Sequence, residues 1–360
     1  MTALSWQLPY LTADLPGIGG VIRAEMTDFI VEEVPAYEPS GEGEHTFFAV
    51  EKTGQPTFRL IKELASRLGI SERDIGYAGL KDARAVAQQT LSVPNVPPET
   101  LLALELDQAR VLWAERHTHK LRIGHLRGNR FTLRIRETVP DAAERVAAIL
   151  AVLTERGVPN GYGPQRFGRR GDNAAVGLAL LRNDRAALRE LGVRQIPYRL
   201  RRLYLSALQS ALFNQLLAAR IAGGTMDRML LGDVAKKQET GGIFNVEDLE
   251  AEQPRAQAWE ISPTGPIYGY KMRAAQADAA ALEADILAQA GLMLEDFRPA
   301  KLKGSRRPLR YRLDALEWQL EEPHTLVIAF FAPKGSFATL LLRELMKTDQ
   351  VLEEDDDPDA

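Results

Sequence analysis

The residues best suited to chemistry lie in one short stretch, Gly79-Leu80-Lys81-Asp82-Ala83-Arg84. Its carboxylate, Asp82, lies between a lysine and an arginine, and nearby positive charge favours the ionised form of a carboxylate. An ionised carboxylate can act as a nucleophile or as an orienting anion, but it is a poor proton donor. Gly76 and Gly79 precede it, where the backbone can turn or let a ligand approach closely. A surface ion pair would have the same spacing, so the pattern alone leaves both interpretations open.

A longer run, from Ala78 to Gln89, resembles the catalytic segment of the TruD family of tRNA pseudouridine synthases. Other stretches resemble further motifs of that family in the same chain order. They include Gly128-Asn129-Arg130-Phe131 and the run from Asn160 to Gly168, in which Tyr162 stands where the family has a phenylalanine. Together the matches span nearly the whole chain, so the resemblance is more specific than any single motif.

The resemblance implies an α/β (α+β) fold with two parts. One is a pseudouridine synthase catalytic domain with a mixed, largely antiparallel sheet, and the other is an inserted α/β TRUD domain; together they form a two-lobed cleft. We expect residues 1–158 and 306–350 to make the discontinuous catalytic domain and 159–305 to make the insertion. Residues 351–360 are expected to be an acidic disordered tail, because six of the last eight residues are carboxylates.

The resemblance also implies a cofactor-free isomerase that converts a uridine in tRNA, expected to be uridine-13, to pseudouridine. The target base must leave its stack for this chemistry, and Asp82 is the expected catalytic carboxylate; whether it attacks the base or the sugar stays open. We expect Arg23 to pair with Asp82 and Phe131 to stack on the uracil. Without the resemblance, Phe131 is more typical of a core residue. The other expected substrate-binding residues are Lys81, Asn129, Arg166, Phe167, Lys120 and Arg122.

The composition fits two domains and excludes several kinds of site. The chain has 360 residues, of which 45% are apolar and 26% charged, values typical of a globular protein of about two domains. It has no apolar run long enough to span a membrane and no apparent secretory signal. The absence of cysteine excludes disulfides and thiolate sites and agrees with a reducing cytosol. We expect a cytoplasmic monomer without a metal, because the close pair His117 and His119 lacks an evident third ligand.

The charge distribution favours RNA as the partner. The net charge is −4, but removing the six acids of the last eight residues leaves +2 for the rest of the chain. Residues 110–136 contain eight lysines and arginines against one acid, and residues 301–312 contain six and no acid. Such clusters are typical of contact with a phosphate backbone, although a solvated protein face gives the same pattern.

Hydrophobic periodicity predicts the elements that position these residues. A helix is predicted over 57–68, with Thr57 as its cap and Gly69 as its stop. Further helices are predicted at 141–155, 174–181, 203–221, 274–292 and 340–347. Strands are predicted at 29–31, 90–93, 111–113, 121–123, 128–135, 318–320 and 325–331.

Two other functions stay open at this stage. An RNA-binding protein with the same fold could act as an RNA-folding chaperone without chemistry. A hydrolase or deaminase could use the acid-rich residues Glu32, Glu33 and Glu42–His45, but no metal set or cysteine pair accompanies them. The intact Gly79-Leu80-Lys81-Asp82 stretch favours catalysis by an isomerase.

Overall fold

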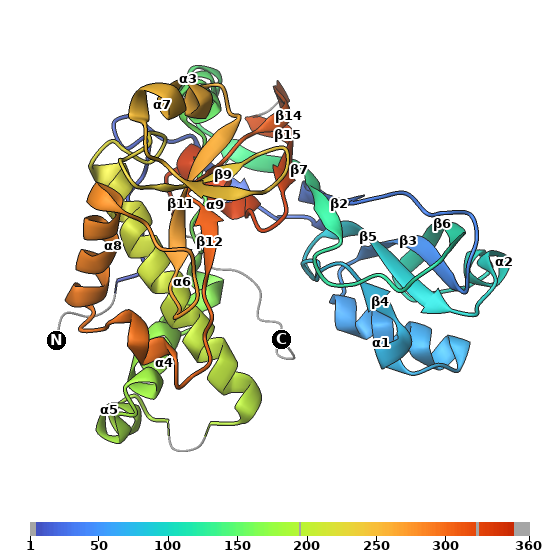
Figure 1. The fold of residues 1–360 in the computed structure, drawn as a ribbon. Helices are drawn as coiled ribbons and strands as arrows, with labels where there is room; N and C mark the ends of the chain where they lie inside the picture. Colours follow the sequence, from blue (N-terminus) through green and yellow to red (C-terminus); the bar gives the residue numbers. More distant parts are fainter. Residues whose placement is uncertain (1–4, 194–195, 322–323, 349–360) are drawn as a thin grey trace. The chain divides into compact units, whose positions relative to one another are not determined.

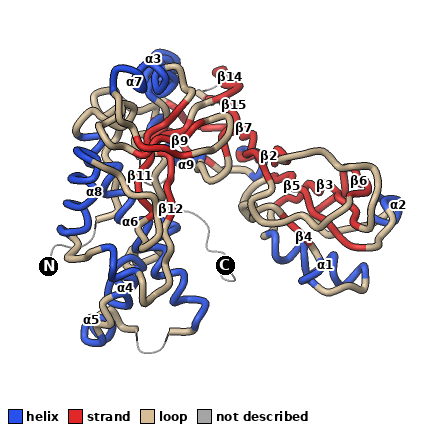
Figure 2. The backbone as a smooth tube through the Cα atoms, viewed as in Figure 1, coloured by secondary structure: helices blue, strands red, loops and turns tan. Residues whose placement is uncertain are grey.

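The chain folds into two compact units (Figures 1 and 2). The computed structural model describes residues 5–193, 196–321 and 324–348. We call Gly17–Ala147 with Arg312–Ala338 the sheet unit, and Ala148–Tyr311 with the described residues before Gly17 and after Ala338 the helical unit. These units group residues by contact, so the predicted division into 1–158 with 306–350 and 159–305 stays a prediction, as does the cleft. The predicted tail at 351–360 lies outside the described residues.

The sheet unit is built on a mixed sheet to which nine strands of the described residues contribute. The strand order is β14-β15-β7-β2-β5-β3-β6, with β1 added to β7 and β4 to β5. Every pairing is antiparallel except that of β2 with β5. The strands are β1 Gly19–Ile22, β2 Phe29–Pro35, β3 His45–Thr53, β4 Gly76–Tyr77, β5 Val86–Pro94, β6 Ala109–His117, β7 Leu126–Thr138, β14 Asp314–Glu321 and β15 Thr325–Pro333. The predicted mixed, largely antiparallel sheet is confirmed.

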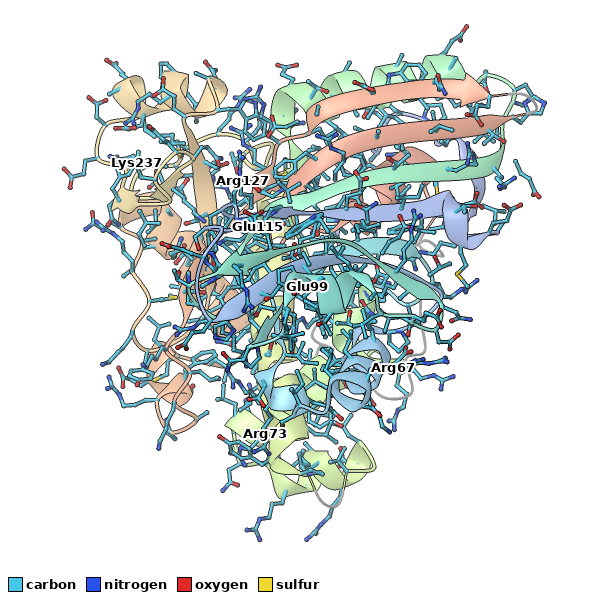
Figure 3. The ribbon with its side chains drawn as sticks, turned by 90° about the vertical axis from the view of Figure 1, so that its right-hand side faces the viewer. Arg67, Arg73, Glu99, Glu115, Arg127 and Lys237 are labelled. Carbon is cyan, nitrogen blue, oxygen red and sulfur yellow. The ribbon has the colours of Figure 1, made fainter. Side chains whose placement is uncertain are left out.

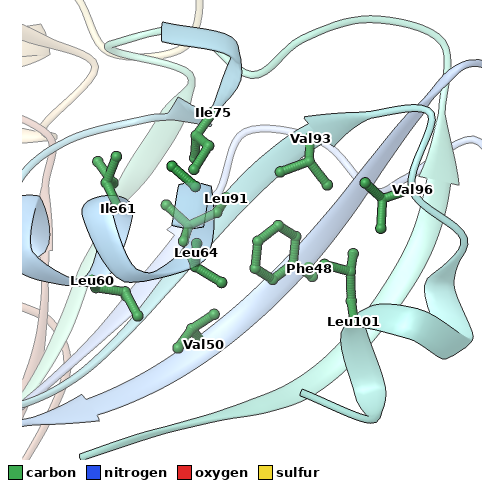
Figure 4. Packing of buried hydrophobic residues seen from close by; sticks show 11 residues of the cluster. Phe48, Val50, Leu60, Ile61, Leu64, Ile75, Leu91, Val93, Val96 and Leu101 are labelled. Atoms are coloured by element: carbon green, nitrogen blue, oxygen red, sulfur yellow. The ribbon is translucent and has the colours of Figure 1, made fainter. Parts of the chain in front are cut away.

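Helix α1, Thr57–Leu68, covers part of this sheet because its apolar residues recur at helical spacing. Leu60 and Leu64 pack in one cluster with Phe48 of β3 and Leu91 of β5, as Figure 4 shows. The helix ends at Gly69, whose φ of 65° is left-handed, as predicted for its stop. The other short helices of the unit are α2 Pro98–Leu102, η1 Met26–Asp28 and η2 Glu72–Asp74.

The helical unit combines helices with a small sheet, which confirms the predicted α/β content. Helix α6, Tyr198–Ala222, packs against α4, Asn173–Leu181, and a sheet forms with the order β10-β9-β11-β12. The unit's other elements are β8 Val158–Pro159, η3 Pro164–Phe167, α5 Arg185–Glu190, β9 Val234–Lys237, β10 Ile243–Asn245, α7 Leu249–Gln257, β11 Ile261–Ile267, α8 Ala277–Gln289, η4 Leu294–Phe297, β12 Ser305–Pro308 and β13 Arg310–Tyr311. Helices α3 Ala142–Arg156 and α9 Ala338–Met346 each begin in the sheet unit and continue into the helical one.

All the predicted helices exist, with ends shifted by a few residues. The prediction of a strand at 121–123 is wrong, since these residues form a loop between β6 and β7. None of the helices in the described residues combines the length and the apolar composition that a bilayer span needs.

The buried cluster under α1 gives a stability prediction. Leu64→Ala removes a fully buried side chain and is expected to lower the free energy of unfolding by about 2–5 kcal/mol, because the neighbours fill the cavity only partly. Urea unfolding followed by circular dichroism measures this. Lys62→Ala, an exposed position on the same helix, is the control and should change stability by no more than about 0.5 kcal/mol. Equal stability of the two variants would contradict the packing described here.

Candidate active site

Asp82 lies in the loop between β4 and β5, and this loop is fastened to the start of α1. The Lys81 amide donates a hydrogen bond of 3.0 Å to the Thr57 hydroxyl, which itself donates to Gln89 Oε1 at 3.0 Å. The prediction that Thr57 caps α1 is therefore wrong: Pro56 is the N-cap and Thr57 is the first helical residue. The Thr57 hydroxyl is committed to the loop instead of to the helix amides.

Arg23 contacts the Asp82 carboxylate, with 3.5 Å between Nη2 and Oδ2. The arginine side chain is 4% exposed and the aspartate side chain 41% exposed, so a buried cation holds a carboxylate that solvent reaches. The guanidinium also lies 4.0 Å from the centre of the Phe29 ring, a favourable cation–π arrangement. The backbone of Arg23 has a φ of 56°, a strained conformation for a residue with a side chain. The structure thus brings together the two residues expected to pair.

Lys81 faces away from solvent, although it neighbours Asp82 in sequence. Its ammonium lies 2.5 Å from Glu33 Oε2, and both side chains are almost fully buried. The second oxygen of Glu33 accepts a hydrogen bond of 3.1 Å from the Thr90 amide. Lys81 was expected to bind substrate; in this structure its charge is occupied by Glu33.

Lys52 of β3 also holds the Asp82 loop, because its ammonium donates a hydrogen bond to the Asp82 carbonyl at 2.7 Å. No role was predicted for it, but a signal exists in the sequence. Phe48, Val50 and Lys52 alternate along β3, and all three are fully buried. A lysine in register with two core residues indicates a buried cation.

Asn129 and Phe131 lie on β7, which β2 separates from β5, the strand that follows the Asp82 loop. The Asn129 Oδ1 atom is buried and has no hydrogen-bond partner among the described residues. Phe131 is only 6% exposed; its ring stacks on Phe330 at 5.4 Å and meets the edge of Phe29 at 6.1 Å. Position 128, directly before Asn129, requires a glycine because a Cβ at this position would overlap the Ala332 carbonyl of β15. The aromatic ring expected to stack on the base is therefore largely packed in the core here.

The predicted basic segment 110–136 contains exposed cations and cations that bond to other groups of the protein. Arg122, Arg127 and Arg130 are exposed, and Figure 3 labels Arg127 among the side chains. Arg134 pairs with Glu321 at 3.0 Å, and Arg136 forks onto Asp28. Arg110 pairs with Glu51, and the Lys120 ammonium donates to the Arg73 carbonyl. Arg116 is the remaining cation of the segment.

Arg166 and Phe167, also expected to bind substrate, belong to the helical unit. The Arg166 guanidinium donates to the Ser206 hydroxyl at 3.3 Å and lies over the Tyr162 ring at 5.3 Å. Phe167 is fully buried and stacks on Trp6 at 4.8 Å. Phe167 therefore anchors η3, the short helix that also carries Arg166.

The prediction of a basic surface at 301–312 is wrong for half of its cations. Arg306 forms a buried ion pair with Glu283 at 2.6 Å. Arg307 donates to the Asn160 carbonyl and side chain, and burial lowers its pKa. Arg310 is buried, donates to backbone carbonyls and stacks on Trp259. The exposed cations that remain are Lys301, Lys303 and Arg312.

His117, His119 and His125 of the sheet unit lie around Tyr37, and His45 lies opposite His117 in the β3–β6 register. The Tyr37 hydroxyl hydrogen-bonds His125 Nδ1 at 2.8 Å, and the rings of His117 and His119 lie near its face. Burial lowers the pKa of His117 and of His45. In the described part of the chain, no three histidine, aspartate or glutamate side chains are arranged to hold a metal ion.

Comparison with known proteins places this geometry in context. The model of the family described as tRNA pseudouridine synthase D (TruD) matches residues 6–191 and 186–345. A tRNA pseudouridine synthase D from a strain of Thermus thermophilus is 49% identical, with 95% of this chain and 92% of that protein covered. Another from Geobacter sulfurreducens is 43% identical, with 94% and 96% covered. A crystal structure assigned to tRNA pseudouridine synthase D from Methanosarcina mazei superposes with a TM-score of 0.78 at 25% identity, over 95% of this chain and 97% of that one.

The buried ion pair gives a second stability prediction. Glu33→Gln leaves the Lys81 ammonium buried without a counter-charge and is expected to lower the free energy of unfolding by about 3 kcal/mol. The double variant with Lys81→Met should recover much of that loss. Asp107→Asn, which breaks the exposed pair with Arg59, should change stability by less than about 1 kcal/mol. Urea titrations of the wild type and these three variants test this, and a double variant no more stable than Glu33→Gln would contradict the pairing.

Proposed function

This chain belongs to the tRNA pseudouridine synthase D (TruD) family, and we propose that it is an isomerase that converts a uridine in tRNA to pseudouridine. The proposed target is uridine-13. The reaction breaks the bond from N1 of uracil to C1′ of ribose and forms one from C5 to C1′. The hydrogen on C5 leaves as a proton, N1 gains a proton, and nothing is oxidised or reduced. The observation that supports this most directly is the Asp82 carboxylate, solvent-accessible but held by a buried arginine.

Asp82 is the proposed catalytic carboxylate. Its loop is fixed by main-chain hydrogen bonds to Thr57 and Lys52, so the side chain can be positioned before substrate arrives, which reduces the entropic part of the barrier. Arg23 contacts it directly and would orient the carboxylate and balance its charge.

Asn129 and Phe131 are the proposed contacts to the uracil. The unpartnered Asn129 Oδ1 could accept the N3–H of the base, and a buried polar atom without a partner is costly unless a ligand supplies one. Phe131 would offer an aromatic contact to the flipped base, which requires that more of its ring become accessible in the complex than the 6% described above. Lys81, bound to Glu33, would act by holding the loop.

RNA backbone contacts are assigned to the exposed arginines of segment 110–136, above all Arg122. They are also assigned to the half-buried Lys120, whose bond to the Arg73 carbonyl would have to be exchanged for one to phosphate. Arg166 is the proposed contact from the helical unit, with Phe167 as its support. The same proposal includes a cytoplasmic monomer that works without a cofactor.

Tritium release from tRNA labelled with [5-³H]uridine tests the function. The wild type is expected to release tritium, and Asp82→Asn to lose release by about 10³-fold or more while still binding tRNA, because the amide keeps the shape and removes the charge. Asp74→Asn, an exposed aspartate in the same unit, is the matched control and should react like the wild type. Transcripts with cytidine in place of uridine-13 should release no tritium from that position.

Each of the other outcomes would indicate a different catalytic residue, a different function or a different target position. Equal release by the wild type and Asp82→Asn would move the chemistry to another residue. Tight tRNA binding without release by the wild type would favour an RNA-folding chaperone. Release that persists on the cytidine-13 transcript would refute the proposed position while leaving the reaction intact.

The division of segment 110–136 predicts the salt dependence of binding. Arg122→Gln should weaken tRNA binding for all sequences alike and reduce the slope of log affinity against log salt by about 1, because one phosphate contact is lost. Arg134→Gln, whose guanidinium is occupied by Glu321, should leave the slope unchanged. Filter binding over a series of salt concentrations measures both. An equal change in the two variants would show that the ion pairs do not separate these arginines.

A further inference from the structure

Lys52 is a fully buried cation whose hydrogen bonds within the described residues all go to carbonyl groups. Its ammonium donates to the Gln55 carbonyl at 2.6 Å, to the Asp82 carbonyl at 2.7 Å and to the Lys81 carbonyl at 3.5 Å. Gln55 lies between β3 and α1, and Asp82 lies between β4 and β5. One nitrogen atom therefore joins two loops that are far apart in the sequence.

Burying this charge is unfavourable, and the surroundings offset the cost only in part. Removing an ammonium from water disfavours its charged form, and burial lowers the pKa of Lys52 to about 8 from the ordinary 10.5. Attraction to Asp82 opposes this shift, and repulsion from Lys81 adds to it. A buried group that served only to fill the core would be better as a methionine or leucine. The charge lies at the proposed catalytic carboxylate, so its role is best sought there.

We propose that Lys52 is a positioning residue, whose protonated side chain fixes the main chain of Asp82 and so aims the carboxylate at the substrate. This inference rests on the proposed function. Arg23 holds the carboxylate itself, whereas Lys52 holds the carbonyl of the same residue. Two points of attachment fix the direction of a side chain, and one does not. Because Lys52 is fully buried, we expect it to affect the turnover rate more than tRNA affinity.

The proton on Lys52 makes this arrangement sensitive to alkaline pH. A neutral amine has two N–H groups for three carbonyls and turns a lone pair toward one of them. The charged groups around it are Asp82 with Arg23, and Lys81 with Glu33. The wild-type kcat is therefore expected to fall as the pH rises through about 8.

Unfolding does not explain such a fall. The pKa of Lys52 is lower in the folded chain than in the unfolded chain, so the unfolded chain binds more protons between pH about 8 and 10.5. Within that window, the contribution of this lysine to the free energy of unfolding rises with pH. Loss of kcat together with retained folding separates a positioning role from a structural one.

The experiment measures tritium release under saturating tRNA from pH about 6 to 9, with thermal unfolding recorded at each pH. The wild type should show an alkaline fall in kcat near pH 8. Lys52→Met should have a kcat lower by about 10²-fold at neutral pH, the scale that misplacement of a reacting group can cost, with tRNA affinity within about twofold and no alkaline fall. Lys62→Met, an exposed lysine on α1, is the matched control and should keep the wild-type profile.

Lys52→Arg decides the matter if the methionine variant does not fold. Its guanidinium stays protonated throughout the range, so kcat should lose the alkaline fall while remaining measurable. The proposal is overturned by a wild-type kcat that does not fall near pH 8, by a folded Lys52→Met with wild-type kcat, or by an unchanged alkaline fall in Lys52→Arg. Absence of tritium release by the wild type at every pH would instead remove the proposed function on which the inference rests.

Discussion

The buried ion pair between Lys81 and Glu33 determines which way the Asp82 loop faces. Two opposite charges in a medium of low polarity are costly to separate, so Lys81 is held inward, and the next residue, Asp82, is left solvent-accessible. Glu33 also lies opposite Asn129 in the β2–β7 register. Glu33 therefore links the loop of Asp82 through its carboxylate and the strand that carries Phe131 through its main chain, so the centre of the sheet sets the geometry of the candidate site.

The arginines of this chain illustrate why charge along a sequence is a weak guide to a binding surface. Segment 301–312 has six cations in a row of twelve residues, but its arginines at 306, 307 and 310 are directed inward. Arg307 and Arg310 donate hydrogen bonds to backbone carbonyls, and Arg310 also stacks on Trp259. Arg306 pairs with Glu283. Arginine suits this work because its planar fork satisfies several acceptors at once. Segment 110–136 is divided in the same way: Arg127 and Arg130 of β7 are exposed, whereas Arg134 and Arg136 of the same strand form ion pairs.

Local patterns predicted most of the elements, and long-range partners account for what they missed. The period of apolar residues gave helix 57–68, and Gly69 gave its end, because both signals act within one turn. Thr57 was misjudged as a cap because its hydroxyl serves Lys81, 24 residues away. The family resemblance indicated Asp82 and Arg23, and the structure brings them together; composition and spacing alone left Asp82 ambiguous. The inward turn of Lys81 and the packing of Phe131 on Phe330 depend on strands distant in sequence and could not be read from it.

The ends of the chain are needed to close both units. In the helical unit, Glu344 accepts the amides of Leu11 and Thr12 across 333 and 332 residues, and in the sheet unit β15 supplies the strand beside β7, with Phe330 opposite Phe131. During synthesis, which proceeds from the N-terminus, the nascent chain carries an unpaired β7 edge until β15, Thr325–Pro333, has left the ribosome. A product of interrupted translation therefore lacks β15 and exposes the edge of β7, which is prone to aggregation. Such an exposed edge makes the truncated chain a target for cellular quality control.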